Sequence, residues 1–168
     1  MPKIIENLEP RLILEARRQI EESGYGALTI RSVAKACGVG VGTVYNYFPS
    51  KDALVVTYML SDWKQCLETI HAVSTGAQDP APVARCIFDQ LLDFSAQHQN
   101  IFRDASAASI FAGSFSRYHS ILRSQLALPL RKFCSSDFAA EFVAEALLTW
   151  TTVSKAFDEI YSMIQALF

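Results

Sequence analysis

Residues 41–47 carry side-chain types that bind double-stranded DNA. Tyr45 and Tyr47 offer hydroxyl groups, which suit phosphate oxygens. The amide of Asn46 can pair with an adenine edge, and the methyl groups of Val41 and Thr43 can touch a thymine methyl. So many hydroxyl and amide groups on the outward face of one short helix exceed what solubility requires. The segment therefore predicts contacts to phosphates and to base edges.

The charge around this segment favours the same interpretation. The whole chain has a formal net charge of -2, which excludes a generally basic nucleic-acid coat. Residues 25–51 nevertheless hold Arg31, Lys35 and Lys51 and neither Asp nor Glu. This locates an anion-binding face in that stretch. The residues that we expect to contact DNA are Thr29, Arg31, Val41, Gly42, Thr43, Tyr45, Asn46, Tyr47 and Lys51.

Other chemistries find less support in the sequence. Asp89 and Asp93 lie four residues apart on one predicted helix face, but so do many solvated carboxylates. The glycine-rich run at 38–42 lacks the preceding strand that a dinucleotide-binding loop requires. The four cysteines are widely spaced without a C-x-x-C pair, and the histidines are isolated, so neither predicts a zinc site. We therefore expect no enzyme, no cofactor and no metal.

Two short helices joined by a glycine must position the predicted contacts. An apolar stripe runs along residues 30–37 of the first helix, which Thr29 would cap. Gly38 can adopt the left-handed backbone that a tight turn between helices needs. The second helix should cover residues 41–47. This pattern predicts a helix-turn-helix, although similar helix pairs also occur as plain packing motifs.

The second helix has an inner and an outer side. Val44 and Phe48 lie four residues apart and should face the first helix, which leaves the polar residues outward. Pro49 ends the helix, and Ser50 can cap the next one. Lys51 then lies in a first helical turn, where free backbone N–H groups favour a phosphate.

These residues resemble the N-terminal domain of the tetracycline-repressor (TetR) family of bacterial transcription regulators. The run GTVYNYFPSKDAL at 42–54 is its most specific part. Gly40 departs from the family pattern, which usually has a capping serine there, and Val41 stands where a polar or basic residue is common. The resemblance covers about the first third of the chain. It rests on Arg11, Ile13, Leu14, Ala16, Gly24, Tyr25, Thr29, Ile30, Ala34, Gly38, Val39, Gly42, Thr43, Tyr45, Tyr47, Phe48, Ser50, Lys51 and Leu54.

The helices on either side of the motif suggest two domains and an all-α fold. A helix over 8–23, ended by Gly24, should brace the helix-turn-helix. Residues 51–75 contain neither Gly nor Pro and carry an apolar stripe, which predicts one helix about 37 Å long. We place a helix-turn-helix DNA-binding domain at 1–50 and a helical effector-binding and dimerisation domain at 51–168.

The second domain should consist of helices throughout. Pro129 must kink or restart the helix at 114–133, and residues 137–168 can form either one helix or two with a break near 149–153. The expected elements are a loop at 74–82 and helices at 82–97, 101–111, 114–133 and 137–168.

The last stretch of the chain is too apolar for a single buried stripe. Residues 137–168 alternate apolar positions three and four apart, which is typical of a helix pair that packs against its twin. The family resemblance implies the same, because the last two helices form the dimer interface in that family. The residues expected in the interface are Val143, Ala146, Trp150, Val153, Phe157, Ile160 and Ile164.

A small-molecule pocket is a further implication of the resemblance. The middle helices carry many aromatic side chains, which suit an apolar or aromatic effector, although aromatic stripes at helical spacing are more often core. The residues expected to line the pocket are Phe88, Phe102, Phe111, Phe115, Tyr118, His119 and Trp150.

Together these features predict a cytoplasmic, homodimeric regulator. It would act as a repressor on a palindromic operator and leave that operator when the effector binds. The alternative keeps the DNA binding but makes the second domain a docking surface for a protein partner. No apolar run reaches membrane-spanning length.

Overall fold

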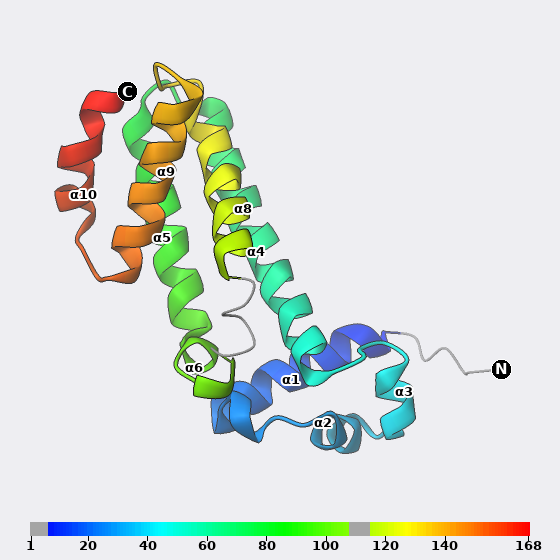
Figure 1. The fold of residues 1–168 in the computed structure, drawn as a ribbon. Coiled ribbons are helices and arrows are strands. Elements are labelled where there is room, and N and C mark those ends of the chain that lie inside the picture. Colours follow the sequence, from blue (N-terminus) through cyan, green and yellow to red (C-terminus); the bar gives the residue numbers. More distant parts are fainter. Residues whose placement is uncertain (1–6, 108–114) are drawn as a thin grey trace. The chain divides into compact units, whose positions relative to one another are not determined.

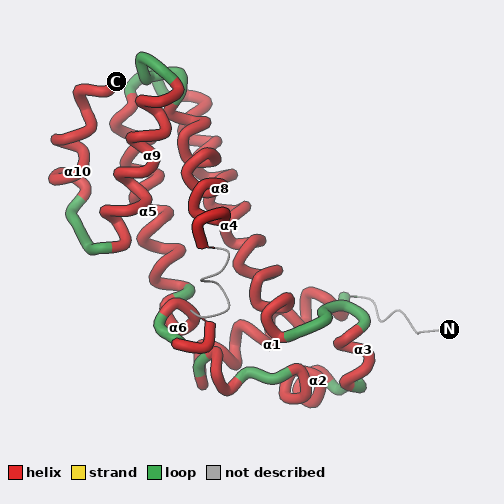
Figure 2. The backbone as a smooth tube through the Cα atoms, in the orientation of Figure 1, coloured by secondary structure: helices red, strands yellow, loops and turns green. Residues whose placement is uncertain are grey.

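The computed structural model describes residues 7–107 and 115–168, and these residues form helices joined by turns and short loops (Figure 1, Figure 2). No strand occurs in either of the two described ranges. The predicted all-α class is therefore confirmed. The elements in chain order are α1 (Leu8–Ser23), η1 (Tyr25–Ala27), α2 (Ile30–Cys37), α3 (Val41–Tyr45), α4 (Lys51–Gly76), α5 (Pro80–Gln97), α6 (Gln99–Phe102), α8 (Phe115–Ala127), η2 (Leu128–Leu130), α9 (Asp137–Thr152), α10 (Phe157–Ile164) and η3 (Gln165–Leu167).

The described residues form two compact units. The first contains residues 7–61 and 98–107, and the second contains residues 62–97 and 115–168. Helix α4 therefore contributes its beginning to the first unit and its remainder to the second. The division into domains 1–50 and 51–168 stays a prediction, and the first unit also takes in a segment from beyond residue 97.

The first unit is organised around one face of α1. Leu8, Leu12, Ala16 and Ile20 repeat every four residues and are almost completely buried. Helices α2 and α3 complete this core. Helix α2 places three apolar side chains in it, and α3 places one. These are Ile30, Val33, Ala34 and Val44.

The second unit packs α9 between α5 and α8, with α10 alongside (Figure 1). Helix α9 is apolar over a wide face, because Ala140, Val143, Ala144 and Leu147 are all fully buried. Small alanines beside larger residues let neighbouring helices approach closely. Trp63 on α4 belongs to the same hydrophobic core.

The loop predicted at 74–82 is shorter in the structure. Helix α4 continues to Gly76 and α5 already begins at Pro80, so the loop covers residues 77–79. Proline is tolerated in a first helical turn because its missing N–H would have no partner there. Asp79 caps the start of α5, since its carboxylate accepts from the Ala81 N–H at 2.7 Å.

The helix predicted at 101–111 is interrupted. Helix α6 ends at Phe102, and a new helical turn begins at residue 105 after Asp104. The rest of the predicted helix lies outside the described residues. Helix α8 ends at Ala127, and Pro129 lies in the 3-10 turn that follows, as a restart at proline predicts.

The C-terminal stretch takes the two-helix alternative. Helix α9 ends at Thr152, and Ser154 has a left-handed backbone with φ 62°, which no helix can continue through. Helix α10 starts again at Phe157.

The residues of the predicted dimer seam differ in their surroundings within one chain, and the seam as a whole stays a prediction. Val143, Phe157, Ile160 and Ile164 are all buried in the core of their own unit, where α10 packs on α5 and α9. The helical periodicity predicted that these side chains are buried, but it did not identify the surface on which they pack. The positions Ala146, Trp150 and Val153 stay predictions, and the last two are 49% and 57% exposed.

Candidate nucleic-acid interface

Helix α2 begins at a reciprocal hydrogen-bonded cap. The Ser32 N–H donates to the Thr29 hydroxyl at 2.9 Å, and the Thr29 N–H donates to the Ser32 hydroxyl at 3.2 Å. This satisfies backbone donors that a helix start leaves without partners. Because the Thr29 oxygen accepts within the cap, its O–H remains able to donate to a phosphate oxygen.

The turn after α2 has the geometry expected for glycine. Gly38 adopts φ 70° and ψ 32°, in the left-handed region. The Val39 N–H then donates to the Ala34 carbonyl at 3.0 Å, which closes a Schellman motif. A residue with a Cβ would be strained at this position, so the angle between α2 and α3 depends on Gly38.

Helix α3 presents its polar residues outward. Val44 and Phe48 are buried beneath it, as predicted. Gly42, Tyr45 and Asn46 are exposed, with Tyr45 at 52%. The helix is two residues shorter than the predicted range 41–47, since it ends at Tyr45 and Asn46 is its C-cap. The remaining predicted contacts on this helix are partly exposed: Val41, Thr43 and Tyr47.

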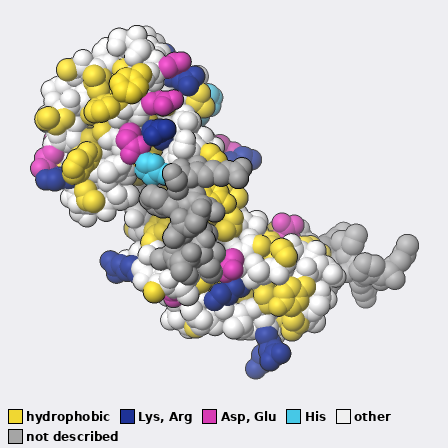
Figure 3. Space-filling view, in the orientation of Figure 1, with side chains coloured by type: hydrophobic (Ala, Val, Ile, Leu, Met, Phe, Trp, Pro, Cys, Tyr) yellow, Lys and Arg dark blue, Asp and Glu magenta, His cyan; other side chains and the backbone are white. Residues whose placement is uncertain are grey.

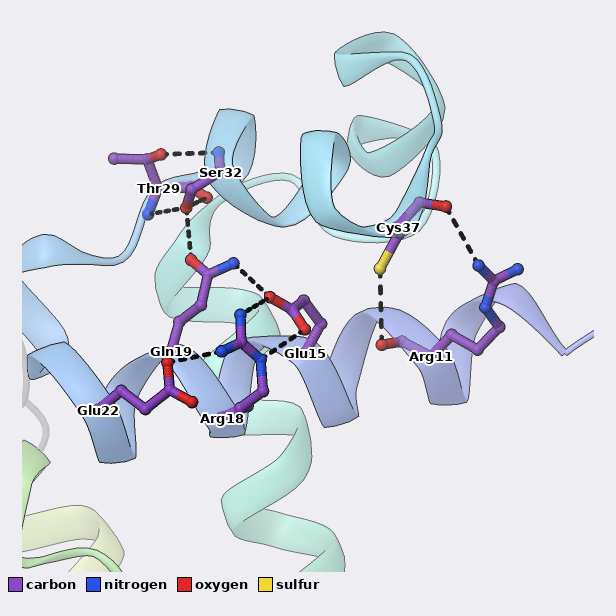
Figure 4. Close-up of polar contacts among 8 residues, drawn as sticks. All are labelled: Arg11, Glu15, Arg18, Gln19, Glu22, Thr29, Ser32 and Cys37. Carbon is purple, nitrogen blue, oxygen red and sulfur yellow. Dashed lines mark hydrogen bonds and ion pairs between the residues drawn. The ribbon is translucent and has the colours of Figure 1, made fainter.

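Helix α1 braces the start of α2 through a polar network (Figure 4). The Ser32 hydroxyl donates to the Gln19 amide oxygen at 2.6 Å, and the Gln19 amide nitrogen donates to Glu15 at 2.7 Å. Arg18 then bonds Glu15 at 2.7 Å and Glu22 at 2.5 Å. These partners keep Arg18 on its own helix rather than free for phosphate.

A second brace reaches the end of α2. The Arg11 guanidinium donates to the Cys37 carbonyl at 3.1 Å (Figure 4). This bond gives a hydrogen-bond partner to a carbonyl at the C-terminal end of α2. It also places the positive guanidinium beside the negative end of the helix dipole. The Cys37 thiol donates back to the Arg11 carbonyl at 3.7 Å, and burial raises the pKa of that thiol. Sequence reasoning missed both braces, because they join residues on different helices.

The basic residues of the predicted face differ in their surroundings. Arg31 and Lys35 are exposed on α2, and Figure 3 shows Lys and Arg side chains projecting from the part of the surface that contains this helix. Lys51 instead places its ammonium over the Tyr25 ring, 4.3 Å from the centroid, and donates to the Tyr25 carbonyl at 3.3 Å. Its phosphate contact stays a prediction, but the charge already has a partner.

The residues predicted to line a pocket are distributed over both units. Phe88 is buried in the second unit, where its ring packs edge-on to Phe157 at 5.5 Å. Phe102 belongs to the first unit and is 51% exposed. His119 approaches Glu145 at 3.5 Å. Tyr118 and Trp150 are exposed, Phe111 lies outside the described residues, and the side chain of Phe115 is not described. The pocket therefore stays a prediction.

The described residues contain neither a candidate metal site nor a candidate membrane span. No group of three or more His, Cys, Asp or Glu side chains there could hold a metal ion. None of the helices in this part of the chain is long and apolar enough to cross a membrane.

The described geometry defines a helix-turn-helix, with a capped first helix, a left-handed glycine turn and a second helix that presents polar residues to solvent. Residues 12–57 match the family described as bacterial regulatory proteins, tetR family. The N-terminal domain of this chain is therefore similar to the DNA-binding domain of that family.

Named relatives agree with this assignment. The HTH-type transcriptional regulator UidR of Escherichia coli K12 is 32% identical over 57 residues, which are 34% of this chain and 29% of UidR. The HTH-type transcriptional repressor KstR of Mycobacterium tuberculosis is 34% identical over 110 residues, which are 58% of this chain and 49% of KstR. The matched stretches thus span less than half the length of these relatives. Both relatives are named as transcription regulators.

A solved structure shows the same fold over nearly the whole chain. The transcriptional regulator of the TetR/AcrR family from Thermobifida fusca superposes with a TM-score of 0.57 at 17% identity, over 95% of this chain and 94% of the other.

Proposed function

We propose that this protein is a DNA-binding transcription regulator that reads its operator with α3. The observation that carries the proposal is the exposed side of α3, where Gly42, Tyr45 and Asn46 follow directly after the Gly38 turn. A short exposed helix with hydroxyl, amide and glycine positions can enter a major groove and contact base edges. Arg31 and Lys35, exposed on α2, supply positive charge for the phosphates nearby.

A homodimer on a palindromic operator follows from exposed apolar residues of the second unit. Phe138 and Phe142 on α9 are 77% and 53% exposed, with their ring centroids 6.5 Å apart, and Trp150 on the same helix is 49% exposed. Large apolar side chains grouped on one helix favour association with a partner surface. Two copies related by a twofold axis would place two α3 helices in successive major grooves, roughly 34 Å apart.

The regulator would act as a repressor that a small apolar or aromatic molecule releases. Helix α4 belongs to both units without a break, so it can carry a displacement from one to the other. For a coupling free energy of about 1 to 3 kcal/mol, effector binding would change operator affinity some 5- to 150-fold. By linkage, operator DNA would weaken effector binding by the same factor. A regulator of chromosomal genes works in the bacterial cytoplasm, where we place this protein.

The DNA-binding proposal is tested by selecting duplexes from a random pool with the purified chain. Enrichment of an inverted repeat with two half-sites about one helical turn apart supports the proposal. A pool that stays unenriched at low salt, with binding that depends only on salt concentration, contradicts it.

The effector proposal needs a separate screen. Apolar and aromatic metabolites that raise the melting temperature of the chain are titrated into the complex with the selected duplex. Molecules that stabilise the chain and leave operator affinity unchanged would contradict release by an effector.

A further inference from the structure

The segment 98–107 lies far along the sequence from the helix-turn-helix but packs in the same unit. Ile101 and Ala107 are buried to 1% and 0% exposure. His98 is also buried, and its ring stacks on Tyr58 of α4 with centroids 5.7 Å apart. The segment is therefore a structural part of the unit that contains α2 and α3, although the chain reaches it only after passing through α5.

Two side chains of this segment contact the backbone on either side of Tyr25. The Asn100 amide donates to the carbonyls of Ile20 and Glu21 at 3.4 and 3.5 Å, near the end of α1. The Asp104 carboxylate accepts from the Gly26 N–H at 3.1 Å, in η1. The segment thus contacts the end of α1 and the turn that leads to α2.

Asp104 has a second role at the same time. Its other carboxylate oxygen accepts from the N–H groups of Ser106 and Ala107 at 2.9 and 3.1 Å, and from the Ser106 hydroxyl. This caps the helical turn that begins at residue 105. The Ser106 hydroxyl bond, followed by the backbone N–H bonds, lowers the pKa of Asp104, so the carboxylate is charged at neutral pH. One side chain therefore holds two backbone segments that are separated by 78 positions.

The turn that Asp104 holds determines where α2 begins. The Leu28 N–H donates to the Tyr25 carbonyl at 3.2 Å, which closes η1, and Thr29 then caps α2. Gly26 lies inside this turn with its Cα close to the carboxylate, because a Cβ built there would be 3.2 Å from the Asp104 oxygen. A shift of η1 would displace the cap of α2, and α3 with it through the Gly38 turn.

We propose that Asp104 is a positioning residue of the DNA-binding site: through the Gly26 N–H it holds η1 where α2 and α3 match the groove. This inference rests on the proposed function and deepens it, because it names a residue that positions the DNA-binding helices.

The first test replaces Asp104 with Asn. An Asn side chain has a single acceptor oxygen, so it can cap the turn at 105 or accept from Gly26, but not both. The probe is the duplex that the wild-type chain selects from a random pool, with a scrambled duplex beside it. We expect Asp104→Asn to weaken binding of the selected duplex about 10- to 150-fold, the size of one charge-assisted hydrogen bond. Binding of the scrambled duplex should change by less than about twofold, since phosphate contacts tolerate a small displacement.

Asp79→Asn is the matched control. Asp79 also caps a helix start with its carboxylate, but it does so at α5 in the second unit. Melting temperatures are measured for both variants. The control should lose thermal stability and retain the wild-type ratio of affinities for the selected and scrambled duplexes, because a loss of stability alone does not change the binding of the folded fraction.

Gly26→Ala provides a second approach to the same contact. Its added Cβ would push against the Asp104 carboxylate, and the φ of Gly26 is not in the left-handed region. It should lower the affinity ratio as Asp104→Asn does, and the double variant should lose no more than the stronger single one, since both break one contact.

The outcomes separate the two proposals. If the wild-type chain enriches a duplex and both variants keep its affinity ratio, Asp104 is no positioning residue and the proposed function stands. Additive losses in the double variant also overturn the inference. If the wild-type chain enriches no duplex, the proposed function fails and the inference fails with it.

Discussion

The Tyr25 hydroxyl donates a hydrogen bond to the Asp52 carboxylate, which joins the turn before α2 to the first turn of α4. Tyr25 is completely buried, and that burial, together with the Asp52 bond, raises the pKa of its hydroxyl above the ordinary range. The residue therefore stays neutral and remains a donor at all physiological pH values. It links the helix-turn-helix to α4, whose residues belong to both units.

Removing this hydroxyl should destabilise the fold. We expect Tyr25→Phe to lower the free energy of unfolding by about 1 to 3 kcal/mol, since the Asp52 carboxylate loses a donor. Urea unfolding followed by circular dichroism measures the loss. Tyr45→Phe is the control, because that ring is 52% exposed on α3 and should leave stability unchanged. Equal stability of Tyr25→Phe and the wild-type chain would contradict a structural role for the bond.

Two basic residues of the predicted interface should differ in what their loss does. Arg31→Ala should reduce the slope of log affinity against log salt by about 0.9, as expected for one lost phosphate contact. Lys51→Ala should chiefly lower the melting temperature, because its ammonium lies on the Tyr25 ring and carbonyl. Affinity titrations at four salt concentrations and thermal unfolding compare the two. A salt slope that falls only in the Lys51 variant would reverse the assignment.

Local patterns were enough to predict the helix-turn-helix from the sequence. The Thr29 cap, the left-handed Gly38 turn and the inward Val44 each depend on residues within a few positions. Such features follow from backbone sterics and from the helical repeat, which act before any tertiary contact forms. The Ser50 cap of α4 is of the same kind, since its hydroxyl accepts from the Ala53 N–H at 3.0 Å.

Contacts between distant segments could not be predicted in this way. The stripe of α10 is apolar whether it faces α5 and α9 or a second copy, so the sequence pattern alone did not predict that Phe157 and Ile160 pack in the core of their own chain. The Asp104 contact with Gly26 joins residues 78 positions apart and leaves no periodic signal. An isolated Asp before a Ser is equally typical of an ordinary turn.

Dimerisation should depend on the exposed face of α9 rather than on α10. Phe142→Glu should shift the sedimenting species from dimer to monomer, because a charge would have to be desolvated in the interface. Leu14→Glu is the matched control, since Leu14 is 68% exposed on α1 in the first unit. Phe157→Glu should instead unfold the second unit, whose core contains that ring. A Phe142→Glu chain that sediments as the wild-type dimer would exclude this face.

The start of α10 should make stability depend on acid pH. The Glu159 carboxylate accepts from the Ala156 N–H at 3.1 Å, and this bond, followed by Lys155, lowers its pKa from 4.5. Because folding lowers this pKa, the charged carboxylate stabilises the folded state at pH values above the unfolded pKa. That stabilisation is lost as pH falls through the folded pKa. The melting temperatures of wild type and Glu159→Gln should therefore differ at pH 7 and converge as pH falls through the lowered pKa of Glu159.

Glu68→Gln is the control for this pH series. Glu68 pairs with Lys64 at 3.7 Å on the surface, where such pairs contribute little. Its melting temperature should follow the wild-type curve throughout. A Glu159→Gln difference that persists unchanged at pH 3 would contradict the cap.

The most direct test of the central claim is whether Asn46 reads a base. The wild-type chain and Asn46→Ala each select duplexes from the same random pool, and the preference at every half-site position is compared. We expect Asn46→Ala to keep the inverted repeat but lose discrimination at one position per half-site, equivalent to about 1 to 3 kcal/mol. An unchanged base preference at every position would contradict the claim that α3 reads the operator through this residue.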